Sequence, residues 1–133
     1  LQEKFHLTYL FVAHNLSVVK HITDRVAVMY VGKIVELAKT AEIFSAPRHP
    51  YTAALMSSVP VPDPRLRMQN VVLKGEVASP ANPPSGCYFH PRCDYATDIC
   101  RAEMPELTEI SPGHFVRCHR AEELTLAGIS GEL

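Results

Sequence analysis

The first part of the chain alternates short apolar runs with polar breaks. Residues 8–13, TYLFVA, are a β-branched and aromatic run between polar residues, which predicts a buried strand of a parallel sheet. Leu16, Val19 and Ile22 then recur at near-helical spacing, so we expect a helix over residues 17–23. A buried strand followed by a helix favours an α/β fold.

A β-hairpin is expected next, within RVAVMYVGKIVEL. Val26, Val28 and Tyr30 alternate with their neighbours, as in a half-buried strand. Gly32 adopts positive φ without strain, so it suits a short loop before a second strand.

Two short helices should follow the hairpin. Thr40 can cap a helix over AEIFSA, which Pro47 would end. Pro50 suits the first turn of a second helix, YTAALMSSV, and His49 before it can bond locally to order the helix start.

The composition changes at Pro60. PVPDPRLRMQN has three prolines in its first five residues and is typical of a linker. One strand is expected within residues 71–86, and residues 87–118 are turn-rich with few apolar side chains. A core this small needs a staple to fold alone. We therefore divide the chain into residues 1–58, a proline-rich linker over 59–84, and a cysteine-rich extension over 85–133.

The composition sets limits on function. The 133 residues suffice for one ordinary domain or two small ones, and 13 basic against 14 acidic residues indicate no nucleic-acid-binding face. No apolar run approaches the roughly 20 residues of a membrane span. With no signal-peptide pattern, we expect a reducing cytosolic location. Because the sequence starts at Leu1, inside helix-like sequence, we expect it to be a segment of a longer protein.

The four cysteines all fall in the last part of the chain. Between Cys87, Cys93, Cys100 and Cys118 lie five, six and seventeen residues. Zinc accepts four such ligands, although its commonest ligand pair has two to four residues between cysteines. An iron–sulfur cluster also takes four thiolates, and its width lets them come from separate loops. Two disulfides, disfavoured in a reducing compartment, and simple burial of the thiols are the other interpretations.

Polar neighbours of the cysteines fit a bound metal centre. A cluster with four thiolates is an anion overall, which nearby guanidinium groups would stabilise. His90 and His119 flank the cysteines and are expected to act as hydrogen-bond donors behind the ligands or to be exposed. The candidate guanidinium groups are those of Arg92, Arg101, Arg117 and Arg120.

Several motifs resemble one protein family. YLFVAHNLSVVKHITDRVAVMYVGKIVE, residues 9–36, resembles the end of the nucleotide-binding domain of an ABC transporter. PRHPYTAALMSSVP, residues 47–60, and the cysteine block after it resemble the C-terminal extension of oligopeptide/dipeptide importer ATPases. The resemblance implies the end of a P-loop-type ABC ATPase domain followed by a small, irregular cysteine-rich module. It also implies a [4Fe-4S] cluster on the four cysteines, with zinc as the alternative.

The resemblance assigns a role to His14. This residue matches the switch histidine of the family, which contacts the γ-phosphate of ATP from the end of a strand. Stabilising charge at the γ-phosphate is central to phosphoryl transfer, and ligands bind at this end of parallel strands. Without the resemblance, a histidine that merely ends a strand would be the preferred interpretation.

The family's remaining catalytic motifs are missing from this sequence. Gly32-Lys33 is followed by Ile34, so it is not the G-x-x-x-x-G-K-[ST] phosphate loop. No magnesium-binding Asp-Glu pair ends a strand, and no SGG-type signature is present. We therefore expect this chain alone not to hydrolyse ATP, although its parent would bind ATP and magnesium.

The function implied is that of an ATP-binding subunit of a di- or oligopeptide importer. The parent would pair with a second ATPase subunit and dock on transmembrane permease subunits, at the cytoplasmic face of the cell membrane. The alternative is a free-standing structural module that binds zinc or an iron–sulfur cluster and has no transport role.

Overall fold

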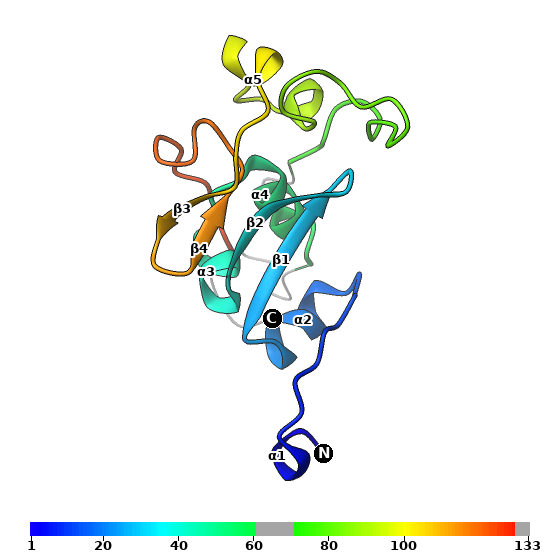
Figure 1. The fold of residues 1–133 in the computed structure, drawn as a ribbon, viewed down its shortest axis with the longest axis vertical. Helices are drawn as coiled ribbons and strands as arrows, with labels where there is room; N and C mark the ends of the chain where they lie inside the picture. The colour runs from blue at the N-terminus through cyan, green and yellow to red at the C-terminus, as the bar shows by residue number, and fades with distance from the viewer. Residues whose placement is uncertain (61–70, 130–133) are drawn as a thin grey trace.

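The computed structural model describes residues 1–60 and 71–129. Within these residues, an antiparallel sheet with the strand order β1-β2-β4-β3 forms the middle of the molecule (Figure 1). α3 packs against β1 and β2, and α4 packs against β2. The strands are β1 (Arg25–Tyr30), β2 (Lys33–Lys39), β3 (Thr108–Ser111) and β4 (His114–Val116).

The predicted hairpin is confirmed as β1 and β2. The strands pair in antiparallel register from Arg25 with Lys39 to Tyr30 with Lys33. Val31 and Gly32 form the two-residue loop, with φ angles of 47° and 73°. Two consecutive positive φ angles are those of a type I′ turn, whose twist matches that of the strands.

The three predicted helices are also confirmed. They are α2 (Leu16–Ile22), α3 (Thr40–Ser45) and α4 (Pro50–Ser57). We had expected Thr40 to cap α3. It is instead the first residue of this helix, and Lys39 occupies the cap position. The Thr40 hydroxyl donates to the backbone oxygen of Thr23 at 2.7 Å, which ties α3 to the end of α2. Among the described residues, no helix has the length and apolar character that crossing a bilayer requires.

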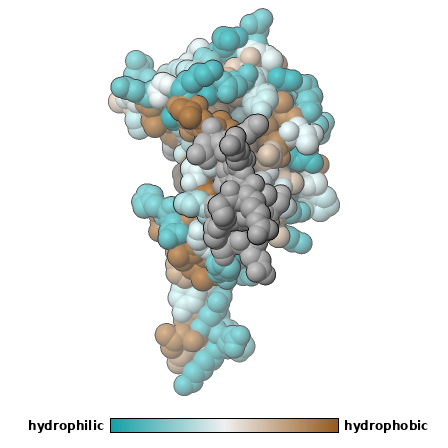
Figure 2. Space-filling view, turned by 180° about the vertical axis from the view of Figure 1, so that it is seen from behind, coloured by the Kyte–Doolittle hydropathy of each residue, from teal (hydrophilic) through white to brown (hydrophobic). Residues whose placement is uncertain are grey.

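The predicted buried strand over residues 8–13 is wrong for this structure. These residues are irregular, and with α1 (Gln2–Phe5) they extend away from the body (Figure 1). Leu10 is 95% exposed and Val12 is 92% exposed, and apolar side chains colour this arm brown in Figure 2. A buried strand needs backbone partners on both sides, and the described sheet offers this segment none.

The cysteine-rich extension joins the same sheet as the first part of the chain. β4 pairs with β2 through Glu36 with Val116 and Leu37 with Phe115. The strand expected within residues 71–86 is absent, and the chain there is irregular. Short helices occur instead near the cysteines, as η1 (His90–Arg92) and α5 (Asp98–Ala102). Residues 61–70 of the predicted linker lie outside the described residues, and the three-part division stays a prediction.

The core draws on both parts of the chain. Phe89 is 2% exposed and packs edge-on against Tyr30, with ring centroids 5.2 Å apart. Its ring also lies 5.4 Å from that of Tyr51. Ile129 is buried in the same cluster as Phe44. We had expected the extension to have too small a core to fold alone. In the structure, the first part of the chain supplies apolar side chains that pack against those of the extension.

Candidate functional site

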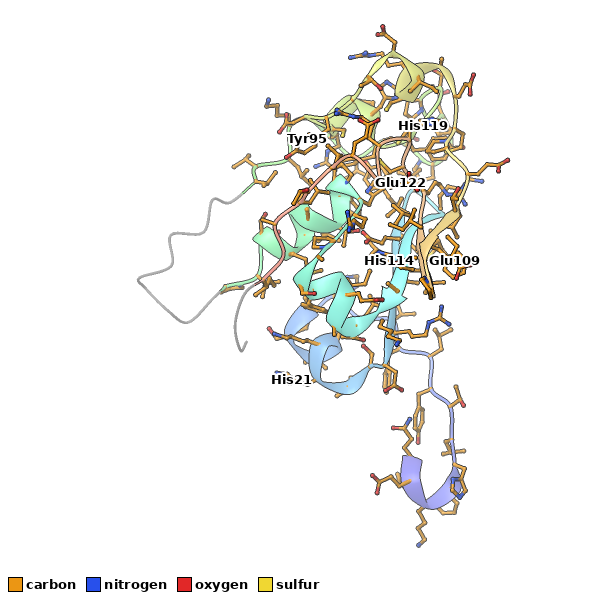
Figure 3. All side chains as sticks on the ribbon, turned by 90° about the vertical axis from the view of Figure 1, so that its left-hand side faces the viewer. His21, Tyr95, Glu109, His114, His119 and Glu122 are labelled. Carbon is orange, nitrogen blue, oxygen red and sulfur yellow. The ribbon has the colours of Figure 1, made fainter. Side chains whose placement is uncertain are left out.

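All four cysteines line one pocket. Cys87 precedes η1, Cys93 directly follows it, Cys100 lies in α5, and Cys118 comes just after β4. Their thiols are free, so the disulfide interpretation is not realised in this structure. Tyr95 and His119, which line the same pocket, mark its end of the molecule in Figure 3. We call this space the cysteine pocket.

Gly86 allows the first and third cysteines to approach each other. The Cys87 N–H donates to the Cys100 carbonyl at 2.8 Å, and the Ser85 hydroxyl donates to the Arg101 carbonyl at 2.9 Å. Gly86 has a φ of +67°, and a Cβ there would come within 2.3 Å of the Cys100 oxygen. A glycine is therefore required both for the backbone conformation and for the close contact.

Three of the cysteine side chains receive a hydrogen bond from the backbone two residues later. The donors are Phe89 to Cys87, Tyr95 to Cys93 and Arg120 to Cys118, and the last N···Sγ distance is 3.4 Å. At Cys100, the Thr97 hydroxyl lies 3.4 Å from Sγ. Such turns orient a sulfur and stabilise negative charge on it, which is what thiolate ligands need.

The thiols of Cys87, Cys93 and Cys118 resist ionisation in the absence of a cation. Burial raises the pKa of Cys93 to about 11 and that of Cys118 to about 12, and it also raises the pKa of Cys87. The neighbouring cysteines oppose ionisation further, as expected for like charges in one pocket. A bound metal centre would reverse this preference, because cations deprotonate coordinating thiols.

The pocket offers four thiol donors and hydrogen bonds to their sulfurs. Within residues 1–60 and 71–129, however, no three His, Cys, Asp or Glu side chains gather as a site for a metal ion. Whether the cysteines act as ligands therefore stays a prediction.

The arginines near the cysteines mainly bind backbone and carboxylate oxygens. Arg117 Nε donates to the Ile34 carbonyl at 2.9 Å, which holds the end of β4 against β2. Arg120 donates to Glu123 at 2.9 Å and to the Tyr95 carbonyl at 3.1 Å. The charge of Arg117 lowers the pKa of Cys87, but it is the smallest of the effects on that pKa.

The histidines beside the cysteines act as donors, as expected. His90 Nδ1 donates to the Cys87 carbonyl at 2.8 Å. His119 Nε2 donates to the Glu103 carbonyl at 2.9 Å. Both rings therefore brace the loops that carry the cysteines.

A buried carboxylate connects the hairpin to the extension. Glu36 on β2 is fully buried, and its oxygens accept from the backbone N–H groups of Arg48 at 2.8 Å and His49 at 3.0 Å. Nε2 of His114 on β4 lies 2.7 Å from Oε1 of Glu36, and His114 is labelled in Figure 3. This short contact between the two side chains joins β4 to β2.

His49 is a second buried link, and it also lines the cysteine pocket. Its Nδ1 accepts from the Tyr51 N–H at 3.1 Å, which caps α4 and confirms the predicted local bond. A backbone hydrogen bond with Arg117 raises the pKa of His49, but burial outweighs it and lowers that pKa to about 3. The ring is therefore neutral at physiological pH.

Sequence analysis missed Glu36 and His114. The available signal was an acidic residue on an apolar face, because Glu36 shares a strand face with the buried Ala38. An acid at such a position is buried only with partners, so it indicates a hidden hydrogen-bond network. Its partner on β4 is distant in sequence, and no local pattern identifies it.

His14 lies apart from the cysteines. It is exposed, at the end of the arm that leads into α2, and α2 and α5 lie at opposite ends of the body (Figure 1). Asn15 caps α2 by accepting from the backbone N–H groups of Ser17 at 3.0 Å and Val18 at 3.3 Å. The cap fixes the turn after His14, and the role of this histidine stays a prediction.

Comparison with known proteins identifies the family. Residues 35–100 match the family model described as "Oligopeptide/dipeptide transporter, C-terminal region". Residues 35–100 belong to this family. The matched residues contain Glu36, the His49-Pro50-Tyr51 helix start and three of the four cysteines, whereas His114 and Cys118 lie beyond the match.

Related proteins extend the similarity beyond the matched region. The "Oligopeptide transport ATP-binding protein AppF" of Bacillus subtilis is 57% identical over 121 residues, which are 90% of this chain and 37% of that protein. The "Probable peptide ABC transporter ATP-binding protein y4tS" of Sinorhizobium fredii is 51% identical over 130 residues, which are 98% of this chain and 37% of that protein. The chain thus spans little more than a third of the length of these relatives.

Proposed function

We propose that this chain is the C-terminal part of an ATP-binding subunit that energises di- or oligopeptide uptake. What supports the proposal is the similarity over most of the chain to proteins named for peptide transport and ATP binding. The parent would bind ATP and magnesium through sequence outside this chain. It would pair with a second ATPase subunit and dock on permease subunits at the inner face of the cell membrane.

In this proposal His14 is the switch histidine. Within the parent domain, the arm would gain sheet partners, and the exposed side chains of Leu10 and Val12 would become buried. The Asn15 cap would then aim the imidazole of His14 at the γ-phosphate. Such a donor stabilises charge that develops during phosphoryl transfer.

Replacing this histidine tests the assignment in the full-length subunit. We expect His14→Ala to lower the kcat of ATP hydrolysis roughly a hundredfold, because loss of one such donor typically has this effect. The measurement is steady-state phosphate release with saturating ATP. His21→Ala, which changes an exposed histidine of α2, is the matched control and should leave kcat unchanged. Equal kcat values for His14→Ala and the wild type would refute the role.

The finer part of the proposal is that Cys87, Cys93, Cys100 and Cys118 hold a [4Fe-4S] cluster. Their position around one pocket and the hydrogen bonds to their sulfurs support it. When bound, such a cluster ties loops together and can carry an electron. Because the four ligands come from the residues on either side of η1, from α5 and from just after β4, its main effect would be to cross-link the extension.

The bound group can be identified directly. We expect the chain, purified without oxygen, to be brown and to contain iron and sulfide in equal amounts, and Cys100→Ser to lose most of both. His119→Gln keeps an N–H donor for the Glu103 carbonyl beside the same pocket and should retain the cluster. A colourless chain with one zinc ion would instead support the free-standing metal module, and full iron retention in Cys100→Ser would refute the ligand assignment.

A further inference from the structure

His49 reaches two of the segments that carry cysteines. Its side chain is buried, with 1% exposed, and it lines the cysteine pocket. The backbone partner of its ring is Arg117, the residue directly before Cys118. The Arg117 N–H already donates to Val35, which leaves the Arg117 carbonyl as the backbone group available to the ring.

The second segment is reached through Phe89. The centroid of this ring lies 5.7 Å from that of His49, and the two planes are tilted by 54°. Phe89 also provides the backbone hydrogen bond to the Cys87 side chain. A shift of the His49 ring would therefore disturb the turn that orients Cys87.

The His49 ring is itself held from the other side. Its backbone N–H donates to the buried Glu36, and its Nδ1 accepts from Tyr51 at the start of α4. Both hydrogen bonds come from the part of the chain before the extension. The imidazole is thus fixed by the hairpin and α4 and in turn contacts the two cysteine-bearing segments.

We propose that His49 is a positioning residue of the cysteine pocket, one that sets Cys118 and Cys87 in place without being a ligand. The proposal rests on the proposed function only in its assignment of a cluster to the four cysteines. Outer contacts of this kind typically change metal affinity by about 10- to 100-fold. The same arrangement makes occupation of the pocket depend on the packing of α4.

Two substitutions separate the contacts of the imidazole. His49→Asn retains an acceptor near the position of Nδ1 and is a good helix cap, but it is too short to reach Arg117. His49→Gln extends its amide N–H to about the position of Nε2 and so preserves the contact with Arg117. We expect His49→Asn to release its cluster to an iron chelator on the order of tenfold faster than wild type. His49→Gln should release it at close to the wild-type rate.

A second measurement on the metal-free chain keeps this inference separate from the proposed function. We expect iodoacetamide to alkylate Cys118 and Cys87 about tenfold faster in His49→Asn than in wild type, with a smaller change at Cys93. Mass spectrometry reports each thiol separately, and general loosening would instead accelerate all of them together. If the wild type binds no cluster, the proposed ligand role fails, while the alkylation rates still test the inference.

The inference is overturned if His49→Asn is folded and alkylates Cys118 and Cys87 at wild-type rates. It is also overturned if His49→Gln loses its cluster as fast as His49→Asn. If His49→Asn does not fold, Phe89→Leu takes its place, because it keeps an apolar side chain but removes the ring contact. That variant should expose Cys87 to alkylation, and an unchanged rate would overturn the inference.

Discussion

Replacing Gly86 by alanine is expected to lower the free energy of unfolding by roughly 2–5 kcal/mol. An L-residue in the left-handed region costs about 1–2 kcal/mol, and forcing atoms into a packed site costs about 1–3 kcal/mol more. The added Cβ would lie 2.3 Å from the Cys100 oxygen and 2.7 Å from the Arg101 carbonyl carbon. These are backbone atoms of α5, which cannot rotate away as a side chain can. The Cys87 loop must therefore move away from Cys100.

Urea denaturation followed by circular dichroism measures this effect. Gly113→Ala is the matched control, since Gly113 has a φ of +75° but a Cβ there would meet no atom within 4 Å. It should cost only the backbone strain, about 1–2 kcal/mol. Alkylation of Cys87 should also accelerate in Gly86→Ala and not in Gly113→Ala. Equal destabilisation in the two variants would show that the contact with α5 is unimportant.

Local patterns were enough to predict the hairpin and the helices. Alternation in β1, a glycine in the loop and a proline in the first turn of α4 are interactions between residues close in sequence. The same holds for the His49 cap, whose partner Tyr51 is two residues away. Each of these elements satisfies its backbone groups within its own segment, so its neighbours in space matter little.

Elements that depend on distant partners were not predictable in this way. β3 and β4 are four and three residues long, and β4 is recognisable only by its pairing with β2. Residues 8–13 differ, because their apolar pattern predicts a buried strand but their side chains are exposed in this structure. A sequence pattern reports what a segment requires, whereas the structure depends on whether a partner is present.

In the candidate site, too, the residues that form a local sequence pattern were predicted, and those that depend on distant contacts were not. The clustering of cysteines in the sequence indicated a shared task, and the four side chains do line one pocket. The residues behind the pocket were harder to find, because Glu36, His49 and Phe89 gain their roles from contacts across the fold. A buried side chain of this kind looks ordinary in sequence, whether it packs or positions another group.

Loss of the buried carboxylate should be the most damaging change in the hydrogen-bond network. Glu36→Ala would leave the N–H groups of Arg48 and His49, and Nε2 of His114, without their acceptor. Leaving a buried donor unsatisfied typically costs about 1–3 kcal/mol for each group, so we expect the loss of three acceptor contacts to cost more than that. Glu36→Gln retains one acceptor oxygen, but its NH₂ group faces a donor, so we expect an intermediate loss of about 1–3 kcal/mol.

Equilibrium urea unfolding of the variants tests this order, with an exposed ion pair as the control. Arg120 and Glu123 lie 2.9 Å apart, but the Glu123 side chain is 65% exposed. Glu123→Ala should change the free energy of unfolding by less than about 1 kcal/mol, because water screens such pairs. The double variant Glu36→Ala/His114→Ala should then be less destabilised than the sum of its single changes, since both remove one interaction. Additive losses, or a Glu36→Ala cost no larger than that of Glu123→Ala, would mean that the carboxylate does not join the hairpin to the extension.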